Sequence, residues 1–90
     1  MMIRKTDFIF QTQLAEETLE VWLAEEWLLP EEDQQDFIFT EADIARARLI
    51  SSLINDFGVN NEGVGIILSL IDQMHSLRKA VAGKLEQGPK

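Results

Sequence analysis

The longest helical pattern in the chain lies at its C-terminal end. Apolar residues between Val64 and Leu85 recur at spacings of three and four, which predicts one helix over about residues 61–86. In a chain of 90 residues, a helix of this length leaves room for only a few short elements besides it. The sequence therefore predicts a mainly α-helical protein that forms a single domain over residues 1–90.

The apolar face of this predicted helix is too wide for short neighbouring helices to cover completely. Leucines widen the apolar stripe, and only Arg78 interrupts it. An exposed apolar face of this size is typical of a surface that packs against another protein chain. We therefore expect a homodimer that uses this helix. The residues expected in the self-association contact are Val64, Ile67, Leu68, Ile71 and Met74.

Two further helices are predicted upstream. The apolar spacing in AEETLEVWLAEEWLLP predicts a helix over about residues 16–29, and Pro30 ends it. Thr40 followed by Asp43 is the signature of a capped helix start, and it predicts a helix over about residues 41–57. The glycine that follows this segment is placed where a helix C-terminal glycine belongs.

The tetrapeptide DFIF occurs twice, at residues 7–10 and 36–39. It is rich in aromatic and β-branched residues, which favour strands. We expect two short strands, over about residues 8–11 and 36–39, that pair with each other. Nothing around the two copies repeats, so an internal duplication is not indicated.

The charges are distributed unevenly along the chain. No Lys or Arg occurs between Lys5 and Arg46, and this interval holds twelve acidic residues. Such a surface repels nucleic acid, because affinity for phosphate comes from Lys and Arg. It attracts a basic protein surface and speeds the encounter. The acidic residues expected to bind a protein partner are Glu16, Glu17, Glu20, Glu25, Glu26, Glu31, Glu32 and Asp33.

Catalytic and metal-binding chemistry finds little support in the sequence. The chain has no cysteine and a single histidine, His75, which we expect on a surface or interface rather than in a catalytic or metal site. No serine lies in a nucleophile-elbow context, and GVNNEGVG lacks the lysine of a phosphate-binding loop. We expect no enzyme activity, no cofactor and no small-molecule substrate.

The chain shows no signal peptide and no apolar run as long as a membrane span, so a cytoplasmic protein is expected. Two tryptophans lie in the helix predicted over residues 16–29. Trp22 is expected in the core, whereas Trp27 is compatible with either the core or a partner contact.

The order of these elements resembles the DNA-binding head of the MerR family. The residues that carry the resemblance are WLLPE and FIFTEADIARARLISSLINDFGVNNEGVGIILSLIDQMHSLR. Within that superfamily they resemble the chaperone-modulator branch called CbpM. The resemblance implies a small, reduced MerR-like winged helix-turn-helix. It also implies a non-enzymatic protein that binds a DnaJ-like (CbpA-type) J-domain co-chaperone and inhibits its action with Hsp70.

The sequence departs from the MerR pattern in one place. Only QTQLAEE separates Phe10 from Thr18, so we expect the first helix of the motif to be reduced or absent. The helix that would read DNA, predicted over residues 16–29, has five glutamates and no Lys or Arg. It lacks the side chains that usually contact guanine and phosphate. A MerR-type transcriptional regulator and an acidic dimeric adaptor with another protein partner are the alternatives.

Overall fold

The computed structural model describes residues 2–87, with side chains as far as Lys84. The chain divides between Val59 and Asn60 into two compact units, which are described separately below. The first unit contains, in chain order, β1 (Ile3–Arg4), α1 (Lys5–Thr12), α2 (Glu16–Ala24), β2 (Glu31–Asp33), β3 (Asp36–Phe39) and α3 (Glu41–Asn55). The second unit contains α4 (Asn61–Gln87). The predicted fold class, a mainly helical winged helix-turn-helix, is confirmed.

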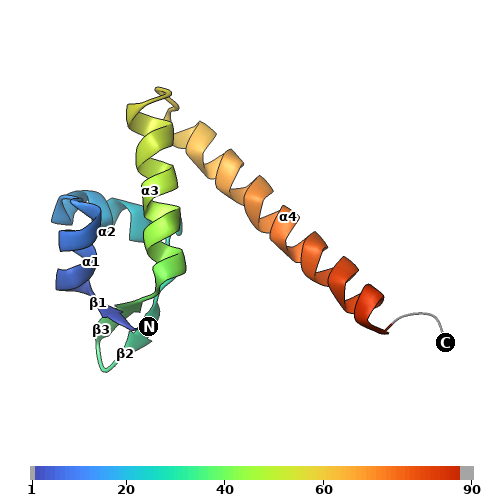
Figure 1. Ribbon diagram of the computed structural model, residues 1–90. Helices are drawn as coiled ribbons and strands as arrows, with labels where there is room; N and C mark the ends of the chain where they lie inside the picture. Colours follow the sequence, from blue (N-terminus) through green and yellow to red (C-terminus); the bar gives the residue numbers. More distant parts are fainter. Residues whose placement is uncertain (1, 88–90) are drawn as a thin grey trace. The chain divides into compact units, whose positions relative to one another are not determined.

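The three strands form one antiparallel sheet in the order β1-β3-β2. Ile3 lies opposite Phe39, and Glu31 lies opposite Ile38 in the hairpin that joins β2 to β3. Figure 1 shows this small sheet at one end of the helices α1 and α3. The central strand β3 contains the second DFIF, as predicted.

The strand predicted over residues 8–11 is wrong, because these residues lie inside α1. Consecutive helical residues point about 100° apart, so Phe8 and Phe10 face different directions. Phe8 is fully buried, whereas Phe10 is 83% exposed. The aromatic and β-branched residues cost this helix only a few tenths of a kcal/mol each in propensity. Burial of Phe8 offsets that cost.

The expected ladder between the two DFIF copies is also wrong. β3 pairs with Ile3–Arg4 and with Glu31–Asp33, not with residues 8–10. The two copies instead meet through side chains, because the rings of Phe8 and Phe39 stack with centroids 4.0 Å apart and planes 16° from parallel. The first motif helix is not absent either. It is α1, and it occupies the segment that was predicted as a strand.

The helix α2 ends at Ala24, five residues before the predicted end at residue 29. Glu26 adopts a left-handed conformation with φ 61°. Its N–H donates to the Leu23 carbonyl at 3.1 Å, and the Trp27 N–H donates to the Trp22 carbonyl at 3.0 Å. This pattern is the Schellman motif, which satisfies the last carbonyls of a helix. The apolar residues that follow Glu26 continue the helical spacing in the sequence, which is why the helix was predicted to be longer. The chain nevertheless leaves the helix at Glu26.

The helix α3 begins as predicted and ends two residues early, at Asn55. At its start the Thr40 hydroxyl accepts from the Asp43 N–H, and the Asp43 carboxylate accepts from the Thr40 N–H at 2.8 Å. These two bonds form the predicted capping box. After the helix, Gly58 has φ 68°, a conformation that a side chain disfavours.

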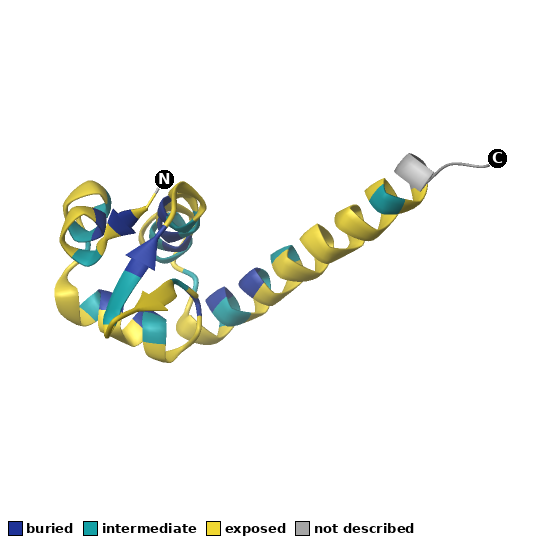
Figure 2. Cartoon of the chain, turned by 90° about the horizontal axis from the view of Figure 1, so that it is seen from below, coloured by how far each residue is buried: buried dark blue, intermediate teal, exposed yellow. Residues whose placement is uncertain are grey.

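The core of the first unit forms between the three helices and the sheet. Its fully buried large side chains are Phe8, Leu19, Leu28, Phe39 and Ile50. Figure 2 shows buried positions on β1 and β3 and on one side of the helices, whereas β2 is exposed throughout. The Arg46 guanidinium adds a polar link, since its Nε donates to the Trp27 carbonyl at 2.5 Å. This bond ties α3 to the turn that follows α2.

The second unit is the helix α4, which matches the predicted residues 61–86 within one residue. Asn60 caps it, because the Gly63 N–H donates to the Asn60 side-chain oxygen at 2.8 Å. None of the helices over residues 2–87 combines the length and apolar character needed to cross a membrane.

Candidate functional site

The exposed face of α2 is acidic. Leu19 and Trp22 are buried, and Glu16, Glu17 and Glu20 are exposed. Two of these acids lie in the first turn, where the positive end of the helix dipole stabilises carboxylates. Ala15 at the N-cap has no side-chain oxygen to bind the first N–H groups, and the helix start has no side-chain cap.

The hairpin β2–β3 presents a second group of acids. All three residues of β2 are exposed, and all three are acidic. The turn residues Gln34 and Gln35 both have positive φ, 50° and 69°, which is the conformation of a tight two-residue hairpin turn. Asp36 lies opposite Asp33, and it forms an ion pair with Arg4 at 2.9 Å.

All eight acidic residues predicted to bind a partner are exposed, and all eight lie in the first unit on α2, the turn after it and β2. They are Glu16, Glu17, Glu20, Glu25, Glu26, Glu31, Glu32 and Asp33. Carboxylates remain in water unless they are paired, so their exposure follows from their charge. The structure therefore leaves each of them accessible to a partner.

Few cations offset these acids. Residues 1–59 contain thirteen acidic residues and four Lys or Arg, a formal net charge of −9. Arg4 is held by Asp36, Lys5 by Glu16 at 3.2 Å, and Arg46 by the Trp27 carbonyl. The first unit is thus a strongly anionic body, and three of its four cations contact groups of the same unit.

The two tryptophans are both buried, at 5% exposure each. Their ring centroids lie 6.2 Å apart, and they form the apolar contact that accompanies the Schellman motif at the end of α2. The assignment of Trp22 to the core is confirmed. Trp27, which the sequence left open, also belongs to the core, and it is not an exposed partner contact.

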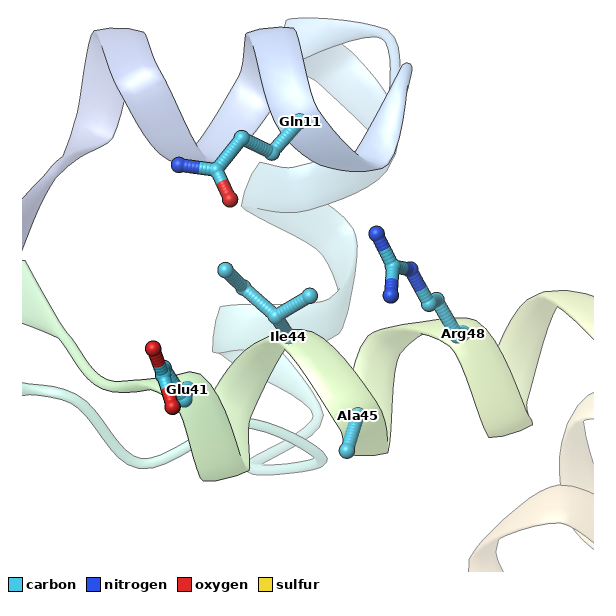
Figure 3. Close-up of a pocket in the computed structure, with 5 residues that line it drawn as sticks. All are labelled: Gln11, Glu41, Ile44, Ala45 and Arg48. Atoms are coloured by element: carbon cyan, nitrogen blue, oxygen red, sulfur yellow. The ribbon is translucent and has the colours of Figure 1, made fainter.

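A shallow pocket of about 250 Å³ lies between α1 and α3. Figure 3 shows the amide of Gln11, from α1, above Ile44 of α3, with Glu41 on one side of Ile44 and Arg48 on the other. The pocket is smaller than the ~300–1,000 Å³ of ordinary ligand sites, and it offers one cation, one acid and one amide around an apolar floor. This arrangement provides neither a nucleophile nor a general base in a closed cleft.

The residues predicted for self-association differ in exposure. Val64 and Leu68 are buried, Ile67 and Ile71 are half-buried, and Met74 is exposed. Further along α4, the exposed apolar residues are Leu70, Met74, Leu77 and Val81. Their spacings are four, three and four, which is the spacing of a coiled-coil seam. Arg78 does not interrupt this seam.

His75 is exposed on α4, in agreement with its prediction as a surface or interface residue. Among residues 2–87, no three His, Cys, Asp or Glu side chains lie close enough together to hold a metal ion. The candidate site is therefore a charged protein surface built on a helix-turn-helix.

The arrangement of α1, a three-residue turn, α2 and a strand hairpin matches a known family. A family model described as MerR HTH family regulatory protein matches residues 3–87. This chain belongs to the MerR helix-turn-helix family. Regulatory proteins of the MerR family are typically not enzymes. No curated protein matches the chain.

Within this MerR-type unit, the sequence prediction missed two features of α1: the contact of Lys5 with Glu16 and the exposure of Phe10. Phe10 was expected inside a strand, and Lys5 was not considered part of any site. Phe10 would have been predicted as exposed if KTDFIFQT had been interpreted as a helix. A helical spacing sets Phe8 and Thr12 on one side and leaves Phe10 on the other.

Proposed function

We propose that the protein is a non-enzymatic chaperone modulator of the cytoplasm, similar to the CbpM branch of the MerR family. It binds a DnaJ-like (CbpA-type) J-domain co-chaperone and inhibits that protein's action with Hsp70. The single observation that carries the proposal is the exposed face of α2, which holds Glu16, Glu17 and Glu20 and no cation.

The charge of this face favours a basic protein partner. J-domains, as the resemblance to CbpM implies, carry a basic helix through which they engage Hsp70. An acidic helix that covers that surface competes with Hsp70 for it. The remaining exposed acids on β2 extend the attractive field and increase the rate of encounter.

DNA recognition by the same helix is disfavoured by the same observation. A MerR-type regulator contacts DNA through α2 and the hairpin, and both elements carry exposed carboxylates here. Each carboxylate facing a phosphate adds repulsion instead of releasing a counterion. An acidic adaptor for another basic protein is the remaining alternative, and the binding experiment separates it from the first.

The test is direct binding of a purified J-domain at about 50 mM and about 500 mM salt. We expect the dissociation constant to rise severalfold between the two conditions, because the Debye length shortens from above 10 Å to a few Å. Absence of binding, or binding that salt leaves unchanged, contradicts the proposal. A gel-shift assay on the DNA upstream of the protein's own gene tests the alternative. Specific binding of that DNA near physiological salt would favour the MerR-type regulator.

We further propose that the protein is a homodimer that associates through α4. The exposed side chains of Leu70, Met74, Leu77 and Val81 form the seam, and the half-buried Ile67 extends it toward the start of the helix. Exposed leucines at this spacing gain about 1.5–3 kcal/mol each when they are buried against a second helix.

The dimer is tested with an aspartate placed inside or beside the seam. We expect Leu77→Asp to convert the protein to a monomer in sedimentation equilibrium, because it would bury a carboxylate at the interface. Ser76→Asp introduces the same charge at the neighbouring exposed position and should leave the dimer intact. Equal effects of both variants, or a wild-type protein that is already monomeric, contradict the dimer.

A further inference from the structure

Phe10 is the most exposed large hydrophobic side chain among those that the structure describes. The fold gives no reason for it, because Phe8 alone fills the core position on α1 and stacks against Phe39. A single exposed apolar residue is ordinary on a protein surface. What distinguishes Phe10 is the surface next to it.

An open hollow of about 300 Å³ lies between α1 and the start of α2. It is lined by Lys5, Thr6, Ile9 and Glu16. Thr6 precedes Phe10 by one helical turn, so Phe10 follows Thr6 on the same side of α1 and lies next to the residues that line the hollow. Ile9 is half-buried and supplies an apolar surface within it. An exposed ring next to a hollow with one apolar wall and charged neighbours can accept an apolar side chain of a partner.

The charges around the hollow restrict which partner can occupy it. Glu16 forms one wall, and Glu17 and Glu20 continue from it along the exposed face of α2. These carboxylates repel nucleic acid and anionic lipid, and they attract Lys and Arg. Because the hollow is open and its volume lies at the lower limit of ordinary ligand sites, it suits one inserted side chain better than an enclosed small molecule.

We propose that Phe10 and the adjacent hollow are the apolar anchor of the partner-binding surface. The occupant is a basic amphipathic helix of the partner. One apolar side chain of that helix enters the hollow against Phe10 and Ile9, and its Lys and Arg residues face Glu16, Glu17 and Glu20. Binding energy in protein interfaces concentrates in aromatic residues that are surrounded by polar contacts, which matches this arrangement. The inference rests on the proposed function and identifies where its partner docks.

Replacement of Lys5 is expected to strengthen partner binding, whereas replacement of Phe10 is expected to weaken it. Its Nζ lies 3.2 Å from a carboxylate oxygen of Glu16, so it occupies a position that a cation of the partner would take. Replacement of Lys5 with glutamine removes this internal competitor and one repulsive charge. Binding of a basic partner should therefore become tighter when Lys5 is replaced, whereas a merely structural role of the ion pair predicts no gain.

The experiment measures binding of the full chain to a purified J-domain by calorimetry at about 50 mM salt. We expect Phe10→Ala to weaken binding by about tenfold or more, and Lys5→Gln to tighten it by about twofold to fivefold. Phe57→Ala is the matched control, because Phe57 is also a highly exposed phenylalanine, at 75% exposure, and it lies in the turn after α3. This control should change the dissociation constant by less than about twofold.

The outcomes separate this inference from the proposed function. If the wild-type chain does not bind the J-domain, both are overturned. If the wild-type chain binds but Phe10→Ala binds equally well, or Phe57→Ala is weakened to the same extent, only the anchor is overturned. Circular dichroism of each variant checks the fold, and Phe10→Leu, which keeps an apolar side chain, should retain more affinity than Phe10→Ala.

Discussion

Replacing Phe8 with alanine lowers the free energy of unfolding by about 3–5 kcal/mol, the usual cost of removing a buried phenylalanine. Phe8 is fully buried, and its ring stacks on that of Phe39. The stacking accounts for about 0.5–1.5 kcal/mol of the loss, and the cavity and lost burial account for the remainder. A domain of this size is stable by only about 5–15 kcal/mol, so the variant loses a large fraction of its stability.

Urea denaturation followed by tryptophan fluorescence measures this loss, because Trp22 and Trp27 are both buried in the same unit. Phe10→Ala is the control from the same tetrapeptide, and it should change stability by no more than about 0.5 kcal/mol. If Phe8→Ala leaves too little folded protein, Phe8→Leu supplies a milder variant with an expected cost of about 1.5 kcal/mol. Equal losses for Phe8→Ala and Phe10→Ala would contradict the helical assignment of this segment.

We expect that neutralising the three exposed acids of α2 weakens the proposed J-domain binding about tenfold at low salt. The triple variant Glu16→Gln, Glu17→Gln, Glu20→Gln removes three carboxylates from the face that carries the proposal. Exposed charge pairs contribute about 0.2–1 kcal/mol each, so three of them account for about 1–2 kcal/mol together. The difference from wild type should shrink in about 500 mM salt, because salt screens exposed charges.

The matched control removes the same total charge elsewhere. Glu41→Gln, Asp56→Asn and Glu62→Gln together neutralise three exposed acids that lie outside the proposed surface. Like the α2 set, this set includes acids in the first turn of a helix, at Glu41 and Glu62. We expect little change in binding from the control. Equal weakening by both triple variants would show that net charge, and not the α2 face, governs the interaction.

The elements that were predicted correctly are those specified by nearby side chains. The start of α3 depends on Thr40 and Asp43, and both hydrogen bonds of their capping box are local. Gly58 adopts the left-handed conformation that often follows a helix, and glycine adopts it without strain, so its position in the sequence indicates the helix end. The exposure of the acids followed from charge alone. In each case the physical cause lies within a few residues of the sequence.

The elements that were predicted wrongly depend on contacts between distant residues. Residues 8–10 form a helix because Phe8 packs against Phe39, thirty-one positions away, and local propensity favoured a strand. The end of α2 depends on a left-handed Glu26, a conformation that sequence patterns associate with glycine. The strand assignment then placed Phe8 and Phe10 on one face, which concealed the exposed ring of Phe10 and the candidate anchor beside it.

The acidic strand β2 also affects how copies of the protein meet. It is an edge of the sheet, and unpaired edges are where separate molecules join into aggregates. Pro30 precedes it without an N–H to donate, and each of its three residues carries a carboxylate. Two such edges brought together would place three negative charges from each molecule side by side. This edge of the sheet is thereby protected against pairing with the same edge of another molecule.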